Sequence, residues 1–482
     1  MKYSVFKRIV AVTLILSIFC GCGTGVESGS SVIRTDSSTL RTGMLDAGIT
    51  EYSVPSTYPA ISVDLVGYSL GKEKKAVIHT EELPDSFSVI DVESSETVYE
   101  GKIKPQDTEG YGIADFSDLE REGTYVLQAP LIGSSKSFVI GEGIYDEVAK
   151  AAFLKLHKLR CSSADNGFCH NYKIPLASDT STELDVTGGW HTGEDGARDV
   201  VNGCLAAYDL MVAYEYHPSS FGDDWGIKES GNKIPDILDE VIFELNWLMK
   251  MQNPDTGGVY TSITREDNGL VIDGEASMAT VNYCVVMTHF ANVIRKFDKD
   301  YSSSCLKAAQ GAWKCLEANK ELVSAEQMYR AAVELYKATG NSAYKAPIDA
   351  YLKDNADKEM DRRAVIDAAV THMSTSRPTD MAACEKLMSR FMSRTHAKSA
   401  AARTAPYMVE SEELTAAELL RNTEELVIVD YIISSEEYTR MEENYLHFLC
   451  GRNSKSEIML DYGYDPDSYA MLLVLLGKLL DE

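Results

Sequence analysis

The chain has 482 residues, of which 44% are hydrophobic and 25% are charged, so it holds enough apolar material for a globular protein of two or three domains. Its 74 acidic side chains outnumber its 46 basic ones and give a formal net charge of −28. Because nucleic-acid phosphates need a basic protein surface, this charge argues against a nucleic-acid partner. A neutral polymer such as a polysaccharide is compatible with it.

The N-terminus has the features of a bacterial targeting signal. Basic residues precede an apolar run over residues 9–19, which is too short to span a bilayer. Gly21 and Cys22 follow shortly after, and a small residue before a cysteine resembles the lipobox of bacterial lipoproteins. We therefore expect residues 1–22 to be a lipoprotein signal peptide, with Cys22 lipidated and the protein extracellular, anchored to the bacterial cell membrane. Simple secretion is the alternative.

Residues 23–58 are rich in Ser, Thr and Gly and have little apolar periodicity, which is typical of a flexible tether. The next segment has short apolar or alternating runs, separated by turn signals about every ten residues. We expect strands in 61–65, 75–78, 123–127 and 137–140. This pattern predicts a small antiparallel β-sandwich over residues 59–141.

A helical period begins near residue 144 and continues to the C-terminus, with apolar residues at three- and four-residue spacing. The predicted helices cover 144–160, 198–216, 234–252, 276–297, 301–318, 324–338, 341–353, 361–371, 378–393, 413–432, 436–450 and 467–481. A dozen helices joined by short loops fit an all-α (α/α)6 barrel over residues 142–482. The periodicity alone is equally compatible with an array of helical repeats.

Four motifs in the helical region decide between these two folds. They are GGWHTGED (188–195), GNKIPDILDE (231–240), ELNWLMKMQNPDTGGVY (244–260) and EENYLHFLCGRN (442–453). Together they resemble glycoside hydrolase family 9, the cellulase family. In the strand region, VDLVGY and EGTYVL resemble the immunoglobulin-like module that precedes many catalytic domains of this family. The resemblance implies a multidomain chain, with an N-terminal immunoglobulin-like β-sandwich followed by an (α/α)6 barrel.

The resemblance also implies an activity, because family 9 enzymes cleave β-1,4-glucans with inversion. An inverting glycosidase needs two carboxyl groups roughly 6.5–9.5 Å apart, one acting as acid and one as base. The family loop usually reads GGW-x-D-A-G-D, and its last Asp, here Asp195, is the general base. Thr192 stands where the first Asp helps to hold the water. A hydroxyl can bind a water but cannot share the negative charge of an Asp pair.

The general acid is harder to assign. SEIMLDY (456–462) resembles the family motif NEVALDY, whose Glu is the acid, so we expect Glu457 in this role. The histidine- and arginine-bearing loop that usually precedes the motif is missing, which leaves Asp461 and Asp465 as competing candidates. The same departures favour an alternative function, a catalytically impaired cell-surface glycan-binding protein on a cellulase scaffold.

The expected substrate is a β-glucan polysaccharide or oligosaccharide, and three residues are expected to bind it. The protein is expected to be a monomer. Trp190 would stack on or wall the sugar site, since an aromatic face suits a pyranose. His191 and Tyr260 lie on loops that the resemblance places at the cleft face. A packed loop aromatic is the alternative for Trp190. For Asp195 the alternative is an N-cap of the following helix.

Cys161, Cys169 and His170 resemble three of the four ligands of a structural zinc in some family members. Two thiolates and an imidazole suit tetrahedral zinc. A Cys161–Cys169 disulfide is the other possibility in a secreted protein.

The fourth zinc ligand in those members is a His three residues after the base, where this chain has Arg198. His191 or Cys204 are the candidates to replace it. Family members also bind calcium, but we expect the acids of residues 236–240 to serve packing and helix capping. Catalysis itself needs no cofactor.

Overall fold

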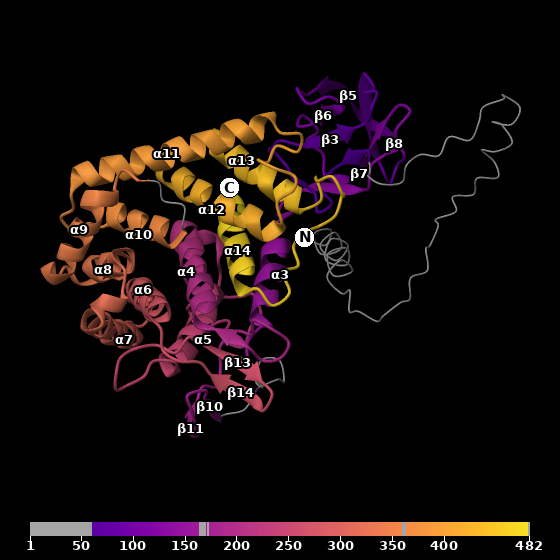
Figure 1. The fold of residues 1–482 in the computed structure, drawn as a ribbon. Helices are drawn as coiled ribbons and strands as arrows, with labels where there is room; N and C mark the ends of the chain where they lie inside the picture. Colours follow the sequence, from indigo (N-terminus) through magenta and orange to yellow (C-terminus); the bar gives the residue numbers. More distant parts are fainter. Residues whose placement is uncertain (1–59, 163–169, 171–172, 359–362, 481–482) are drawn as a thin grey trace, which may run out of the picture.

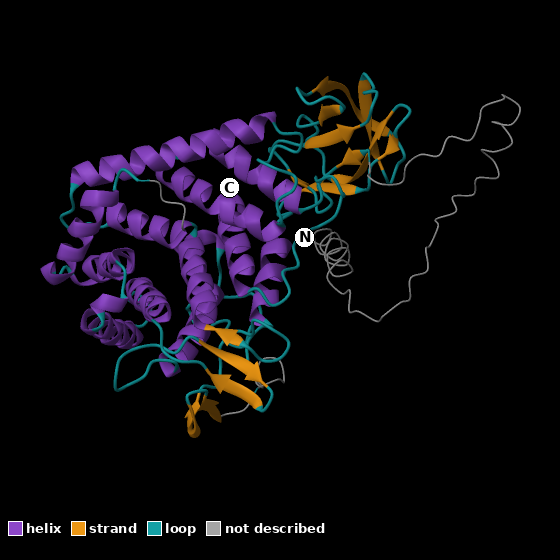
Figure 2. Cartoon of the chain, in the orientation of Figure 1, coloured by secondary structure: helices purple, strands orange, loops and turns teal. Residues whose placement is uncertain are grey.

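The structure is a computed structural model that describes residues 60–162, 170, 173–358 and 363–480 (Figure 1). The expected signal peptide, Cys22 and the whole of the expected tether lie outside these residues. A β-sandwich and a helical barrel follow each other along the chain (Figure 2). Among the described residues, no helix is long and apolar enough to cross a membrane.

The β-sandwich contains nine strands. They are β1 (Ile61–Ser62), β2 (Tyr68–Ser69), β3 (Lys75–His79), β4 (Ser86–Asp91), β5 (Thr97–Pro105), β6 (Tyr111–Asp115), β7 (Gly123–Ala129), β8 (Gly133–Ser134) and β9 (Phe138–Gly141). The order is β1-β3-β6-β5-β4-β7-β9-β2, with β8 paired to β7. In β4 the buried side chains alternate along the strand, and they join those of β7 in one core. The predicted sandwich is confirmed.

The barrel contains twelve helices among the described residues. They are α3 (Asp146–His157), α4 (Val200–Tyr216), α5 (Asp236–Lys250), α6 (Ser277–Ile294), α7 (Lys299–Ala318), α8 (Ala325–Thr339), α9 (Lys345–Asn355), α10 (Arg363–Ser374), α11 (Met381–Thr404), α12 (Ala416–Ile433), α13 (Glu436–Leu449) and α14 (Pro466–Leu480). Each corresponds to one predicted helix. Four residues separate the last strand of the sandwich from α3, and the expected boundary at residues 141/142 falls at the start of this connection.

Six of the helices form a closed inner ring. The helices α4, α6, α8, α10, α12 and α14 contact one another in this order, and α14 packs back on α4. The other six lie outside, each against an inner helix. Inner helices are surrounded by protein, so α14 is buried at every position from 466 to 477. The closed ring confirms the (α/α)6 barrel and excludes an open repeat array.

A five-stranded sheet at one end of the barrel was not predicted. Its strands are β10 (Lys173–Leu176), β11 (Asp179–Asp185), β12 (Arg198–Asp199), β13 (Ser262–Glu266) and β14 (Gly269–Ile272), in the order β11-β10-β14-β13-β12. Strand β12 runs directly into α4, and α6 follows β14 closely. The sheet therefore lies at the end of the barrel where the inner helices begin (Figure 1).

The sandwich is joined to the barrel by a buried polar contact. Asp64 of the sandwich bonds to His447 Nδ1 at 2.8 Å and to the Tyr145 hydroxyl at 2.9 Å through the same carboxylate oxygen. The Leu65 amide donates to the Cys450 carbonyl at 2.9 Å. Burying Asp64 without these partners would be costly, so the contacts fix how the two domains meet.

Candidate active site

The GGWH motif forms a tight loop against α5. Gly189 has φ +82°, and a Cβ on it would come within 2.5 Å of the Trp247 ring. Only glycine fits this position without displacing Trp247. The backbone can therefore turn sharply and bring Trp190 into the space between α3 and α5.

Trp190 is packed inside the protein and is only 1% exposed. Its indole N–H donates to Glu240 Oε1 at 2.7 Å, and its amide donates to Glu244 Oε2 at 2.8 Å. A ring with this burial offers no face to a sugar. The expected stacking role is therefore corrected to the packed loop aromatic that was its alternative, because two acids of α5 hold the residue from within.

The two acids that hold Trp190 differ in protonation. Burial alone would raise the pKa of Glu240, but the Arg160 charge and a hydrogen bond with His157 hold it below its usual value. Burial raises the pKa of Glu244 to about 8 despite the bond from Trp190. Glu244 is thus mainly neutral at pH 7, so only one buried carboxylate charge has to be balanced behind the loop.

Asp195 lies at the exposed tip of the loop. Its Oδ1 accepts the Ala197 amide at 3.1 Å, and its backbone carbonyl accepts two N–H groups of Arg265 at 2.8 and 3.0 Å. The N-cap of α4 is Asp199, which accepts the Asn202 amide at 2.7 Å. The capping alternative for Asp195 is therefore excluded, and its carboxylate faces solvent.

The segment between α13 and α14 carries all three acid candidates. Glu457 is exposed, and its carboxylate makes no hydrogen bond or ion pair with any described residue, while the Asn453 side chain holds its backbone. Asp461 pairs with Lys155 at 2.7 Å, and this hydrogen-bonded partner lowers its pKa. Asp465 accepts the Ser468 hydroxyl at 2.6 Å in the first turn of α14.

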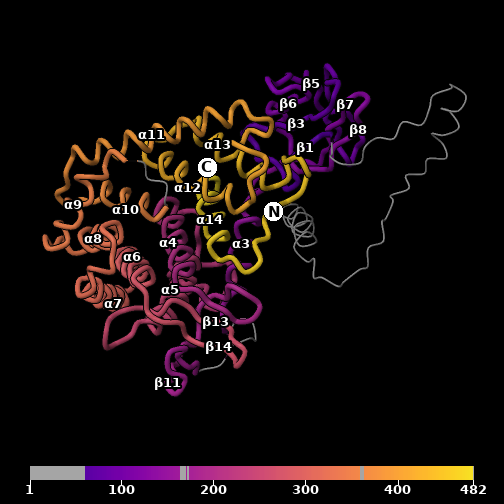
Figure 3. Tube along the Cα trace, viewed as in Figure 1, coloured from indigo at the N-terminus to yellow at the C-terminus, as the bar shows by residue number. Residues whose placement is uncertain are grey.

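The loop of Asp195 and the segment of Glu457 precede two neighbouring inner helices. Asp195 lies three residues before β12, which runs directly into α4, and the 451–465 segment leads into α14. The helices α4 and α14 pack side by side in the inner ring. Between successive inner helices, an outer helix leads the chain back to the starting end of the barrel. Both inner helices therefore begin at the same end. Figure 3 shows the 451–465 segment running from the sandwich along α3 to this end.

The other two expected substrate-binding residues are also mostly covered. His191 is 4% exposed and Tyr260 is 9% exposed. The Tyr260 amide donates to the Met251 carbonyl at 3.0 Å, which fixes it in its loop. His191 needs correction, because its imidazole points to Cys161 and His170 within the protein. Tyr260 keeps only a small exposed edge.

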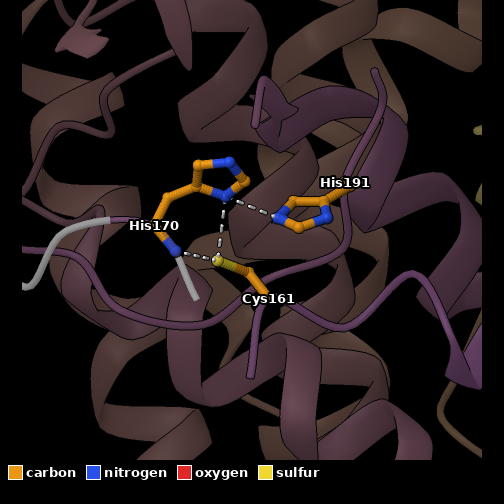
Figure 4. Close-up of side chains that lie close together, drawn as sticks. All are labelled: Cys161, His170 and His191. Atoms are coloured by element: carbon orange, nitrogen blue, oxygen red, sulfur yellow. Dashed lines mark hydrogen bonds between the residues drawn. The ribbon is translucent and has the colours of Figure 1, made fainter. Parts of the chain in front are cut away.

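Cys161, His170 and His191 gather their ligand atoms in one place (Figure 4). The Cys161 Sγ lies 3.7 Å from His170 Nδ1, which lies 3.1 Å from His191 Nε2. Zinc bonds of about 2.3 Å to sulfur and 2.0–2.1 Å to nitrogen imply tetrahedral ligand separations of roughly 3.3–3.6 Å. The three atoms therefore fit zinc. Cys169, the fourth candidate, lies outside the described residues.

The structure distinguishes His191 from Cys204 as the residue that could replace the zinc ligand lost at position 198. Burial and the nearby charges of His170 and Arg198 lower the pKa of His191 to about 4, so its imidazole is neutral and able to bind a metal. Cys204 instead lines a cavity of about 10 Å³ between the inner helices. Arg198 donates to the carbonyls of Val186 and Gly188 and so supports the loop. His191 is the partner that completes the cluster.

A second group of possible metal ligands consists of Asp223, Asp236 and Asp239. The expected packing role is present, since Asp236 accepts the Trp225 amide at 2.6 Å and Asp239 accepts the Asn232 amide nitrogen at 3.0 Å. Yet Asp236 Oδ1 is buried without a hydrogen-bond partner among the described residues. Burial raises the pKa of Asp239 to about 6. Three carboxyl groups whose ligand oxygens lie within 4.8 Å of one another fit a bound divalent ion.

Comparison with known proteins agrees with this fold. Residues 145–469 match the model of glycosyl hydrolase family 9, and residues 56–134 match that of the cellulase N-terminal ig-like domain. These matches define the chain as an immunoglobulin-like module joined to a cellulase-type helical barrel. Since the first match covers more than half of the sequence, the chain belongs to glycosyl hydrolase family 9.

Two relatives are similar over part of the chain. Endoglucanase D of Acetivibrio thermocellus is 29% identical over 281 residues, which are 53% of this chain and 42% of that protein. Cellodextrinase of Butyrivibrio fibrisolvens is 28% identical over 349 residues, which are 63% of this chain and 62% of that protein. The chain thus spans less than two thirds of the length of either relative.

Solved structures share the fold. A metagenome-derived glycoside hydrolase family 9 endoglucanase has a TM-score of 0.77 at 21% identity, covering 88% of this chain and 99% of that one. AaCel9A in complex with cellobiose-like isofagomine has a TM-score of 0.76 at 20% identity, covering 88% and 100%. The Zn-binding triple mutant of family 9 endoglucanase J30 has a TM-score of 0.71 at 22% identity, covering 82% and 83%.

Proposed function

We propose that this protein is an inverting glycoside hydrolase that cleaves β-1,4-linked glucans, with Asp195 as general base and Glu457 as general acid. One observation carries the proposal: the loop with the exposed Asp195 and the segment with the exposed Glu457 lead into the adjacent inner helices α4 and α14. Relatives named for endoglucanase and cellodextrinase activity support the substrate class.

In this mechanism Asp195 takes a proton from a water as the water attacks the anomeric carbon. The bond from that carbon to the glycosidic oxygen breaks, and its electron pair goes to the oxygen, which receives a proton from Glu457. Because the water attacks opposite to the departing oxygen, the β-linkage yields an α-configured product. Both carboxyl groups then return to their starting states by exchange of one proton with solvent.

The choice of Glu457 over its neighbours follows from the contacts of each carboxyl group. A general acid must hold a proton at the working pH. Asp461 does not meet this need, because Lys155 favours its ionised form. Asp465 is engaged with Ser468 at the start of α14. Of the three candidates, Glu457 is the one whose carboxyl group is bound by no other described residue.

A second function, glycan binding without turnover, is favoured by one departure from the family pattern. Thr192 replaces the acid that would hold the water and share charge with Asp195. Without this charge the attacking water is less polarised. A barrel that keeps its shape but loses this group can hold a glycan and fail to cleave it.

Two structural metals accompany the proposal. Zinc would be held by Cys161, His170 and His191 with Cys169, and calcium by the three-aspartate group near α5. Zinc at the first site would tie the segment after α3 to the loop of Asp195, since His191 and Asp195 are four residues apart. Neither metal takes part in the chemical steps.

The location of the protein is also a proposal. We infer an extracellular monomer tethered to the bacterial membrane through a lipid on Cys22, with residues 23–58 as the tether. Metabolic labelling with a radioactive fatty acid tests this inference. Label incorporated by the wild type and absent from Cys22→Ser supports it, and equal labelling of both proteins contradicts it.

The test of the activity is reducing-sugar release from soluble β-glucan by the 24–482 fragment beside Asp195→Asn and Glu457→Gln. We expect activity in the wild type and a loss of about 10²-fold or more in each variant. Asp461→Asn serves as the matched control and should retain activity. Binding seen by calorimetry without release by the wild type would establish the glycan-binding function instead.

A further inference from the structure

The β-sandwich contacts the barrel at the segment that carries Glu457. Ser62 in β1 is 1% exposed, and its hydroxyl donates to the Asn453 carbonyl at 2.9 Å. The Ser456 hydroxyl donates to the Ser62 hydroxyl at 3.2 Å. Both contacts are buried, so each is shielded from competition by water.

Asn453 in turn holds the backbone of Glu457 from both sides. Its Nδ2 donates to the Glu457 carbonyl at 2.7 Å, and its Oδ1 accepts the Glu457 amide at 3.3 Å. Ser456 adopts φ +47°, a left-handed conformation that costs a non-glycine residue free energy. A turn of this kind persists only where its surroundings hold it. The Ser62 and Asn453 contacts supply that support.

Two further contacts bring the sandwich against the same segment. Lys136 donates its Nζ to the Ser456 carbonyl at 2.8 Å. Gly451 packs so closely on the sandwich that a Cβ there would lie 2.6 Å from Leu65 Cγ. The start of the segment is therefore fixed by the sandwich at Gly451, Asn453 and Ser456, directly before the candidate acid.

We propose that Ser62 is a positioning residue for Glu457, acting through Asn453 and Ser456. The inference rests on the proposed function, in which Glu457 is the general acid. The β-sandwich thereby does more than cover the barrel, because it sets the backbone from which the acid reaches the substrate. A misplacement of the acid by about 1 Å is enough to lower the rate strongly.

The test compares Ser62→Ala with Lys72→Met in the 24–482 fragment. Lys72 also joins the sandwich to the barrel, but its ion-pair partner at 3.5 Å is Glu443 of α13, which lies outside the 451–465 segment. Two readouts are taken: amide exchange over residues 454–461, and kcat and KM on cello-oligosaccharides. Lys136→Met is the second variant, since its exposed side chain can be shortened without unfolding the core.

We expect Ser62→Ala to speed exchange over residues 454–461 and to lower kcat roughly tenfold with KM within about twofold of the wild type. Lys136→Met should act in the same direction but more weakly, and Lys72→Met should change neither readout. Unchanged exchange in Ser62→Ala overturns the inference. So does faster exchange with unchanged kcat in an active enzyme. A wild type without hydrolysis refutes the proposed function, and with it the role of Ser62 in catalysis, whatever the exchange shows.

Discussion

The Thr192 amide donates to the Ala197 carbonyl at 2.8 Å and closes the loop that carries Asp195. This bond uses only the backbone, so the side chain at position 192 can change without opening the loop. We predict that Thr192→Asp raises kcat at least about tenfold on soluble β-glucan, because the new carboxylate adds charge beside the base and the water.

Thr192→Asn is the control for this change, since it has the size of Asp without its charge. Initial rates of reducing-sugar release at saturating substrate measure the effect. An Asp variant no faster than the Asn variant would show that the loss of the acid at position 192 does not limit the rate.

Trp190→Phe tests whether this residue packs or binds sugar. The change removes the N–H that serves Glu240 and leaves a buried acceptor with one partner fewer. We expect the free energy of unfolding in urea to fall by about 1–3 kcal/mol, with glucan affinity unchanged. Trp313→Phe, at another buried tryptophan whose indole makes no hydrogen bond to a described residue, should cost less. Weaker glucan binding at unchanged stability would show instead that Trp190 binds the sugar.

Glu244 makes stability depend on pH. Its pKa is about 8 in the folded protein and near the ordinary value of 4.5 in the unfolded chain, so the folded state holds a proton that the unfolded state releases. The contribution of this group is therefore fully present below pH 4.5 and is lost as the pH rises to about 8, at roughly 1.4 kcal/mol per pH unit.

Glu244→Gln keeps an acceptor for the Trp190 amide without a titrating group. We expect its free energy of unfolding to fall less steeply than that of the wild type between pH 5 and 8, as measured by urea titration. Glu194→Gln, at an exposed position, should follow the wild type. Parallel curves for Glu244→Gln and the wild type would mean that Glu244 ionises normally in the fold.

The zinc content of two variants tests whether His191 or Cys204 is the fourth zinc ligand. We predict one zinc per chain in the protein purified without chelator, measured by mass spectrometry of the metal. His191→Ala should lose most of it, because three ligands bind zinc less tightly than four. Cys204→Ala should retain it, since Cys204 lies apart from the cluster. The opposite pattern would assign the fourth position to Cys204.

The sequence predicts the helices well and the barrel-end sheet poorly, for a physical reason. Every helix must bury an apolar stripe, so its period is visible along the chain. Strand β11 reads Asp-Thr-Ser-Thr-Glu-Leu-Asp and is exposed along nearly its whole length, and β12 has only two residues. Neither needs an alternating pattern, because pairing within a surface sheet buries little side-chain area.

The candidate site was predictable where the motif itself carries the chemistry. Asp195 and Glu457 stay predictions from their motifs, whereas the burial of Trp190 is not visible in its motif, because its partner Glu240 lies 50 residues along the chain. Likewise, two aspartates precede α4, and only the structure assigns the cap to Asp199. Contacts between distant segments decide such roles, and local sequence does not contain them.

The most direct test of the central claim is the anomeric configuration of the first product. Proton NMR during hydrolysis of a cello-oligosaccharide by the wild-type fragment records it before mutarotation. The inverting pair of Asp195 and Glu457 predicts that the α-anomer appears first and that neither Asp195→Asn nor Glu457→Gln produces it at a comparable rate. The β-anomer appearing first, or full activity in either variant, would contradict the account.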